Sequence, residues 1–285
     1  ANALYGSAAL DLPRRGVYRV QRGVGGLAET LVEWLRRNGA TVRFRERVDR
    51  ILVSKGRAVA VRTARGLEAR ADVIVGNLTP WSLTGLLGDA APAALTRRIQ
   101  RRAPTWGAFM VYAGVDEVVF ADKASHHQIV MDARQPIGDG NSVFVSASST
   151  EDAGRALHGQ RAVTLSTHTA VEPWIALKRA DPTAYERRKA EYAQRLLRAA
   201  ERALPSFRAG LRFHLTASPN SFEHFTRRPL GMVGGFAQTS LWSAWGPRTP
   251  IHGLWLVGDS IFPGQSTAGV TLGAMRVAGA LLRQR

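Results

Sequence analysis

The chain has 285 residues, of which 45% are hydrophobic and 21% are charged, and its formal net charge is +17. This length and composition are those of a folded globular protein with one or two domains. Cysteine is absent, which excludes disulfides, thiolate catalysis and cysteine metal sites.

The positive charge comes almost entirely from arginine, which is spread along the chain in short doublets such as Arg36-Arg37 and Arg227-Arg228. Because there is no dense basic arm and no nucleic-acid module signature, we expect no nucleic-acid partner. The seven histidines are scattered, and only His126 and His127 are neighbours, so we expect no metal site. No apolar run reaches the roughly 20 residues of a membrane span. We therefore expect a cytoplasmic protein, with peripheral contact to an anionic membrane left open.

The first predicted elements are a short strand at Val17–Val20 and a helix that ends at Asn38-Gly39. The apolar face of this helix is made of residues at helical spacing, namely Leu27, Thr30, Leu31, Trp34 and Leu35. A further strand is expected at Thr41–Phe44. Between the first strand and the helix, Gly23–Ala28 matches the pattern G-x-G-x-x-A, with Glu46 about 20 residues further on. The preceding strand is too polar for the centre of a parallel sheet, so we disfavour this segment as the main nucleotide site and keep it as an alternative.

A hairpin is predicted next, with strands at Val48–Val53 and Ala58–Arg62 around a turn that contains Gly56. Ala71–Val75 is expected to be a short buried strand, and Ala93–Arg101 a short helix. From Thr105 onward the pattern changes to alternating strands of a largely antiparallel sheet, at Thr105–Val115, Gln128–Asp132, Ser142–Ser148 and Ala162–Thr169.

A long helix is predicted from Pro182 to about Leu204. Asp181 is a good N-cap, Pro182 suits the first helical position, and Pro205 blocks continuation. Its buried face is expected to contain Tyr185, Tyr192, Leu196, Ala199 and Ala203. The opposite face is rich in arginine and glutamate and is expected to be solvated.

The C-terminal stretch combines a strand, a carboxylate, a loop of small residues and a helix. Leu254–Val257 is a continuous apolar run that suits a buried strand, and Gly258-Asp259 ends it. A loop with Pro263 and Gly264 follows, and a helix is predicted from about Ala268 to Leu282. Such a unit can bind a nucleotide cofactor through helix N–H groups. The pattern alone equally allows an ordinary strand–loop–helix with Asp259 as a solvated turn residue.

This stretch resembles the C-terminal signature of the phytoene desaturase-like flavoproteins, which include carotenoid desaturases and the related isomerases and saturases. Gly258-Asp259-Ser260 and Phe262–Thr267 stand at the positions of that signature. The resemblance implies an α/β (α+β) fold, with a partial FAD-binding domain of the glutathione reductase type and an inserted substrate domain built on a mixed or antiparallel sheet. The expected domains are residues 1–88 and 226–285 for FAD and 89–225 for the substrate.

The resemblance also implies how FAD is held. Asp259 would hold the ribityl or pyrophosphate part, the amides of Gly269 and Val270 would lie near the pyrimidine oxygen, and the backbone of Val48 would meet the adenine edge. The residues expected to bind FAD are Val48, Gly258, Asp259, Gly264, Gln265, Ser266, Gly269 and Val270. No catalytic acid or base and no metal ligand is assigned.

The implied reaction is FAD-dependent dehydrogenation of a long, hydrophobic isoprenoid such as a carotenoid. The alternatives are a flavin-dependent isomerase or amine oxidase on the same scaffold, or a non-catalytic subunit or fragment that binds a partner or lipid. The family's N-terminal G-x-G-x-x-G segment is not found in this sequence. We therefore expect the C-terminal portion of a longer or split protein, which by itself holds FAD poorly or forms a homodimer.

Overall fold

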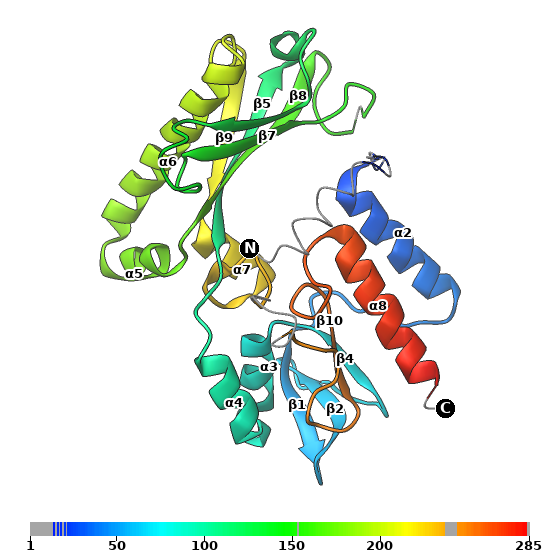
Figure 1. Cartoon of the computed structure of the whole chain (residues 1–285). Coiled ribbons are helices and arrows are strands. Elements are labelled where there is room, and N and C mark those ends of the chain that lie inside the picture. Colours follow the sequence, from blue (N-terminus) through cyan, green and yellow to red (C-terminus); the bar gives the residue numbers. More distant parts are fainter. Residues whose placement is uncertain are drawn as a thin grey trace. The chain divides into compact units, whose positions relative to one another are not determined.

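The computed structural model describes Arg14, Gly16, Tyr18, Val20 and residues 22–152, 154–236 and 244–283. Its elements are shown in Figure 1. The helices are α2 (Gly23–Arg37), α3 (Pro80–Leu87), α4 (Ala93–Gln100), α5 (Glu172–Ala180), α6 (Pro182–Ala203), α7 (Pro219–Thr226) and α8 (Thr267–Leu282). The strands are β1 (Val48–Ser54), β2 (Arg57–Thr63), β3 (Glu68–Arg70), β4 (Ile74–Asn77), β5 (Gly107–Asp116), β6 (His126–Val130), β7 (Ser142–Ala147), β8 (Gln160–Thr169), β9 (Leu211–Ala217) and β10 (Leu254–Val257).

The chain divides into two compact units. One contains Leu31–Thr105 and Gly234–Arg285, and we call it the β10 unit; the other contains Val20–Thr30 and Trp106–Val233, and we call it the sheet unit. The middle of the chain is thus inserted between two segments of the β10 unit. The assignment of residues 1–88 and 226–285 to FAD and of 89–225 to the substrate stays a prediction.

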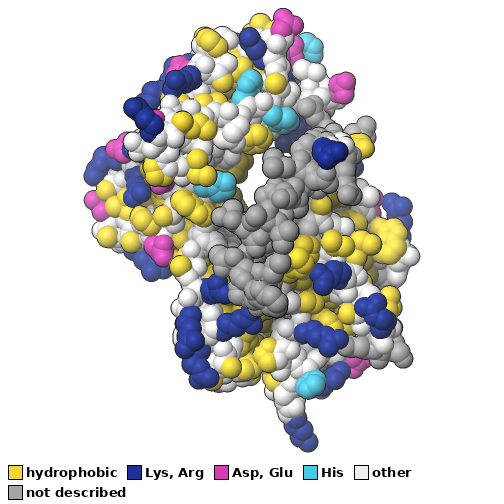
Figure 2. All heavy atoms as spheres, in the orientation of Figure 1, with side chains coloured by type: hydrophobic (Ala, Val, Ile, Leu, Met, Phe, Trp, Pro, Cys, Tyr) yellow, Lys and Arg dark blue, Asp and Glu magenta, His cyan; other side chains and the backbone are white. Residues whose placement is uncertain are grey.

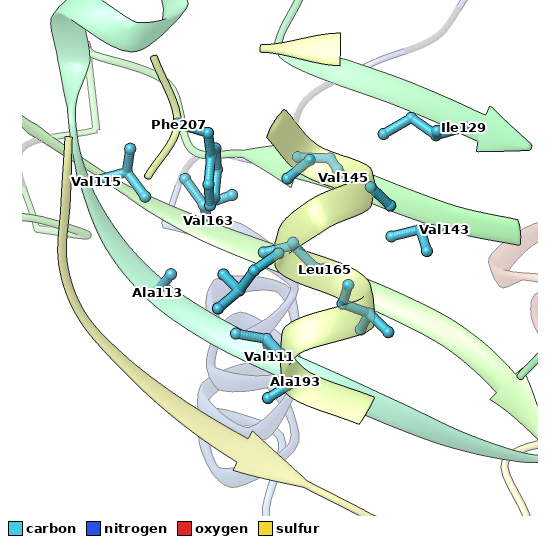
Figure 3. Close-up of a cluster of buried hydrophobic side chains, with 14 of the residues drawn as sticks. Val111, Ala113, Val115, Ile129, Val143, Val145, Val163, Leu165, Ala193 and Phe207 are labelled. Carbon is cyan, nitrogen blue, oxygen red and sulfur yellow. The ribbon is translucent and has the colours of Figure 1, made fainter. Parts of the chain in front are cut away.

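The sheet unit is built on five antiparallel strands in the order β6-β7-β8-β5-β9. The four strands predicted after Thr105 are therefore confirmed, with ends shifted by one or two residues. Alternate residues of β5 and β8, such as Val111, Val115 and Leu165, are fully buried on one face of this sheet. They pack against α6, as the close-up in Figure 3 shows for Leu165 and for Ala193 of that helix. One face of the sheet is thus closed by a helix.

Helix α6 forms where its capping residues predict it. The Asp181 carboxylate accepts from the Ala184 amide at 2.8 Å, and Pro182 occupies the first turn. Four of the five predicted residues, Tyr185, Tyr192, Leu196 and Ala199, are confirmed as buried, since they are at most 4% exposed. Ala203, at the last turn of the helix, is only partly buried. The helix therefore contributes a continuous apolar stripe to the core of the sheet unit.

The β10 unit contains two small sheets. β1, β2 and β3 form an antiparallel sheet, and β10 pairs with β4 in parallel. Leu83 and Leu87 of α3, Ile99 of α4 and Val277 of α8 are buried in its core together with Leu256 of β10. Because the two strands are parallel, their carboxyl ends lie at the same edge, where Asn77 ends β4 and Gly258-Asp259 follows β10.

Two predictions for this region need correction, and a third is confirmed. Thr41–Phe44 is not a strand, since no neighbouring strand pairs with it in the described part of the chain. The strand expected at Ala71–Val75 is β4, which starts three residues later, and Val75 is 45% exposed because only β10 flanks it. The helix after Gly26 is confirmed as α2, but its apolar face is not buried: Leu31 is 56% exposed and Trp34 59%.

A bidentate ion pair links two strands of the sheet unit. Arg212 of β9 donates to both carboxylate oxygens of Asp116 in β5, and its Nε lies 2.7 Å from Oδ1. The hydrogen bond and charge of Arg212 lower the pKa of Asp116, and the carboxylate raises the pKa of Arg212.

This pair makes the stability of the sheet unit pH-dependent. Because the folded pKa of Asp116 is depressed, the pair stabilises the fold above the unfolded pKa, near pH 4, and this contribution is lost as the pH falls through the folded value. We expect Arg212→Gln to lower the urea midpoint at pH 7 and to converge on the wild type at pH 2. A difference that persists unchanged at pH 2 would assign the effect of the substitution to packing.

Candidate functional site

The candidate cofactor site begins where β10 ends. Val257 pairs with Asn77, the last residue of β4, and the chain then turns at Gly258, whose φ is +99°. A Cβ at Gly258 would lie 2.2 Å from Oδ1 of Asn77, so only glycine fits beside this side chain. The half-buried Asp259 follows directly at the edge of the parallel pair. Such an edge is where ligands bind in open α/β sheets.

Residues 234–236 pack against the start of the loop that contains Asp259. The fully buried Ser260 hydroxyl accepts from the Phe236 amide at 3.2 Å, and a Cβ at Gly235 would lie 2.4 Å from the Asp259 carbonyl oxygen. Thr105 Oγ1 donates to the Gly234 carbonyl at 3.1 Å. The backbone at Gly235 therefore approaches the loop more closely than any other residue type would allow.

The loop leads into the N-terminus of α8. Ser266 is the N-cap, and its Oγ accepts from the Gly269 amide at 3.0 Å, while its carbonyl accepts from the Val270 amide at 3.0 Å. The amides of Thr267 and Ala268 have no acceptor among the residues that the structure describes. Both residues are exposed. The first turn of α8 thus presents two N–H donors at the positive end of the helix dipole.

The structure brings most of the predicted FAD residues into this strand–loop–helix. Gly264 has a φ of +86° and is buried within the loop, and Gln265 is exposed beside Gly234. Gly258, Asp259, Ser266, Gly269 and Val270 lie on the same segment. Val48 is placed elsewhere: it starts β1 and pairs with Thr63 in the antiparallel sheet. The roles of these residues toward FAD stay predictions.

Sequence reasoning missed Thr267 and Ala268, the residues that carry the open amides. The family resemblance implied that the amides of Gly269 and Val270 lie near the pyrimidine oxygen. In the structure these two N–H groups are bonded to Ser266, and their role toward FAD stays a prediction. A signal was present, because serine just before a helix is a typical N-cap, and its side chain accepts from the amide two or three residues further on.

A second surface lies on the sheet unit, on the face of the sheet opposite α6. The register places Tyr112 of β5 beside Leu215 of β9, and Gly114 beside Phe213. Tyr112, Phe213 and Leu215 are 39%, 57% and 66% exposed. Phe144 of β7, 42% exposed, lies on the same face, because it pairs with Ser166 and Ser166 pairs with Met110. We call these four residues, Tyr112, Phe144, Phe213 and Leu215, the open sheet face.

The geometry of the open sheet face depends on Gly114. A Cβ there would lie 2.4 Å from Cε1 of Phe213, so the missing side chain lets the ring lie against the strand. The hydroxyl of Tyr112 donates only weakly, to the sulfur of Met110 at 3.4 Å, and burial raises the pKa of this phenol. The phenol therefore stays neutral at pH 7, and the face carries large apolar groups without a formal charge.

The described residues include no group of three His, Asp or Glu side chains placed to hold a metal ion. They also include no helix long and apolar enough to cross a membrane.

The polar groups of the β10–α8 segment fit part of a flavin nucleotide. A carboxylate suits ribityl hydroxyls, and paired amides at a helix start suit a carbonyl or phosphate oxygen.

Comparison with known proteins finds relatives that match most of this chain. Over 269 residues the chain is 30% identical to a prolycopene isomerase of Arabidopsis thaliana, a match that covers 90% of this chain and 44% of the relative. It is 24% identical to a neurosporene-forming phytoene desaturase of Cereibacter sphaeroides, and this match covers 90% of this chain and 52% of the relative. The chain thus spans about half the length of these curated relatives. No family model matches the sequence.

Solved structures show the same fold at low sequence identity. An oxidoreductase from Methanosarcina mazei is 18% identical and superposes with a TM-score of 0.66 over 91% of this chain and 55% of its own. A putrescine oxidase variant superposes with a TM-score of 0.62 at 16% identity, over 94% of this chain and 54% of its own. Cyclohexylamine oxidase from Brevibacterium oxydans superposes with a TM-score of 0.56 at 16% identity, over 92% of this chain and 53% of its own. The predicted fold class, that of the flavin-dependent oxidoreductases, is confirmed.

Proposed function

Because the chain is homologous to the carotenoid desaturases and isomerases over nine tenths of its length, we propose that it forms part of an FAD-dependent oxidoreductase. The observation that carries the cofactor assignment is the β10–α8 segment with its carboxylate and its two open amides. When bound, FAD supplies the hydride acceptor. Asp259 would accept hydrogen bonds from ribityl hydroxyls, and the amides of Thr267 and Ala268 would donate to a flavin oxygen.

We propose that the open sheet face binds the substrate. This face presents a large apolar area on a rigid sheet, made by the exposed side chains of Tyr112, Phe213 and Leu215. None of these three side chains is charged. Such a surface suits a long hydrophobic isoprenoid better than an amine, which would need an acceptor or an aromatic cage for its charge. The role of the protein is then to orient the apolar substrate and to exclude water.

Two reactions fit this surface. Dehydrogenation of adjacent carbons lengthens a conjugated polyene, as the name of the phytoene desaturase implies for that relative. Isomerisation is the second candidate, since the relative at 30% identity is an isomerase. The two differ in a simple readout: desaturation removes two hydrogens and shifts the absorption of the polyene to longer wavelength, whereas isomerisation leaves the mass unchanged.

The proposal extends to partners of the whole protein. A long isoprenoid is stored in lipid, so the enzyme would contact a membrane peripherally to collect it. The apolar stripe of α2, with Leu31 and Trp34 exposed, is the surface that a second copy or the remaining half of the protein would cover. The predicted homodimer and the predicted missing half both stay predictions.

The substrate surface can be tested on the chain as it is. We expect the double variant Phe213→Ala/Leu215→Ala to weaken binding of a long polyene by about tenfold or more, because each side chain contributes about 1.5–3 kcal/mol when fully covered. Binding is measured in mild detergent by quenching of tryptophan fluorescence. Phe225→Ala on α7, 82% exposed, is the control and should bind as the wild type does. Equal affinities for all three proteins would refute the open sheet face as the substrate surface.

A further inference from the structure

A group of hydroxyl side chains borders the open sheet face. In the register of the sheet, Thr164 of β8 is directly opposite Tyr112 of β5, and Ser146 of β7 is directly opposite Thr164. Ser166, two residues further along β8, lies on the same face and is opposite Phe144. We call Ser146, Thr164 and Ser166 the hydroxyl patch. It continues the surface made by the apolar side chains across two more strands.

The hydroxyl patch has hydrogen-bonding capacity that the protein does not use. Thr164 Oγ1 lies 3.5 Å from the Ser146 carbonyl oxygen, which is longer than an ordinary hydroxyl hydrogen bond. The hydroxyls of Ser146 and Ser166 form no hydrogen bond with any residue that the structure describes. All three side chains are half-buried, so water reaches them now. A hydrocarbon laid over the patch would remove this water without replacing its hydrogen bonds, which costs free energy.

The surroundings of the hydroxyl patch carry no charge. Two rows of directly opposed residues cross the four strands from β9 to β7, and they are Leu215, Tyr112, Thr164 and Ser146 in one row and Ala217, Met110, Ser166 and Phe144 in the other. None of these side chains is acidic or basic. In Figure 2 the area over β7 and β9 is mostly yellow, white and cyan, and the dark-blue and magenta side chains lie toward the outline of the sheet unit. The patch therefore suits a neutral polar group, because a phosphate, a carboxylate or an ammonium group would find no opposite charge here.

The apolar side chains and the hydroxyl patch lie within reach of one long molecule. Leu215 on β9 and Ser146 on β7 stand in the same row, three inter-strand spacings apart. Three spacings amount to about 14 Å. A long isoprenoid that rests on Phe213 and Leu215 therefore extends to the patch with one of its ends.

We propose that the isoprenoid substrate carries a neutral oxygen, as a hydroxyl or a carbonyl group, near one end, and that the hydroxyl patch binds this oxygen. Serine and threonine hydroxyls both donate and accept hydrogen bonds, so they pair with either group. The patch then selects an oxygenated isoprenoid over the hydrocarbon with the same carbon skeleton, because only the former pairs with the covered hydroxyls. This inference rests on the proposed function, since it takes the open sheet face as the substrate surface.

The test compares two probes that differ only in oxygen, β-carotene and its dihydroxylated derivative zeaxanthin. The patch variant is Thr164→Val/Ser146→Ala, which removes two hydroxyls at nearly unchanged volume. The control is Thr216→Val/Ser206→Ala, the same pair of changes away from the patch. Thr216 of β9 pairs with Val111 and so lies on the face toward α6, and Ser206 is exposed after that helix. Affinities are measured in mild detergent by quenching of tryptophan fluorescence, and circular dichroism checks that each variant folds.

Because the two probes partition differently into detergent, each variant is compared with the wild type for one probe at a time. We expect the patch variant to bind zeaxanthin about tenfold more weakly and β-carotene within about twofold of the wild type or more tightly, since only zeaxanthin loses hydrogen bonds. The control should bind both probes as the wild type does.

Two kinds of failure can be told apart. If the patch variant changes both affinities equally or leaves that for zeaxanthin unchanged, while Phe213→Ala/Leu215→Ala still weakens both, the hydroxyl patch is refuted and the substrate surface stands. If neither probe binds, or if Phe213→Ala/Leu215→Ala has no effect on either, the substrate surface is refuted and this inference with it.

Discussion

Trp174→Ala is expected to destabilise the sheet unit by about 3–5 kcal/mol, the cost of removing a large aromatic side chain from a core. Trp174 is fully buried on α5 and stacks on Phe109 at 5.4 Å between centroids. Its ring also meets Tyr192 edge-on at 4.9 Å, and its Nε1 donates to Thr169 Oγ1 at 3.0 Å. The substitution therefore removes packing and a buried hydrogen bond together.

The measurement is the free energy of unfolding in urea, followed by circular dichroism. Trp34→Ala is the matched control, because Trp34 is 59% exposed on α2, and it should change the stability by no more than about 0.5 kcal/mol. If the two variants unfold at the same urea concentration, Trp174 is not the centre of this core.

Gly235→Ala is expected to disrupt the cofactor site and to cost about 1–3 kcal/mol through overpacking. The added Cβ would lie 2.4 Å from the Asp259 carbonyl oxygen and 2.9 Å from the Ser260 amide, both backbone atoms that cannot turn away. The loop would have to shift, and the Ser260 hydroxyl would lose its bond from Phe236. We expect FAD binding to fall at least about tenfold, since loss of a correctly placed polar contact costs 1–3 kcal/mol.

Gly246→Ala provides the control in the same unit, because a Cβ there meets no atom within 4 Å. It should leave both stability and FAD binding at the wild-type level. Flavin fluorescence and urea unfolding measure the two properties on the same samples. A Gly235→Ala protein that matches Gly246→Ala in both would show that the loop yields without cost.

Local signals in the sequence were enough to predict several elements. Asp181, Pro182 and Pro205 defined the limits of α6 to within a residue, because capping and proline effects are local. The apolar run before Gly258 likewise predicted β10 and the helix that follows its loop. These are segments in which neighbouring residues determine the structure.

What depends on distant residues could not be predicted. The open sheet face exists because β5 pairs with β9, which brings Tyr112 beside Leu215 from a hundred positions away. Neither strand reveals this register by itself. Thr41–Phe44 has the apolar alternation of a strand but no partner to pair with, so it remains irregular.

The most direct test of the account is a titration of the chain with FAD, read by quenching of flavin fluorescence. The account predicts saturable binding that is too weak to survive desalting, that Gly235→Ala reduces and that Gly246→Ala leaves unchanged. Binding that does not saturate, or that responds equally to the two glycine substitutions, would contradict the assignment of the β10–α8 segment to the cofactor.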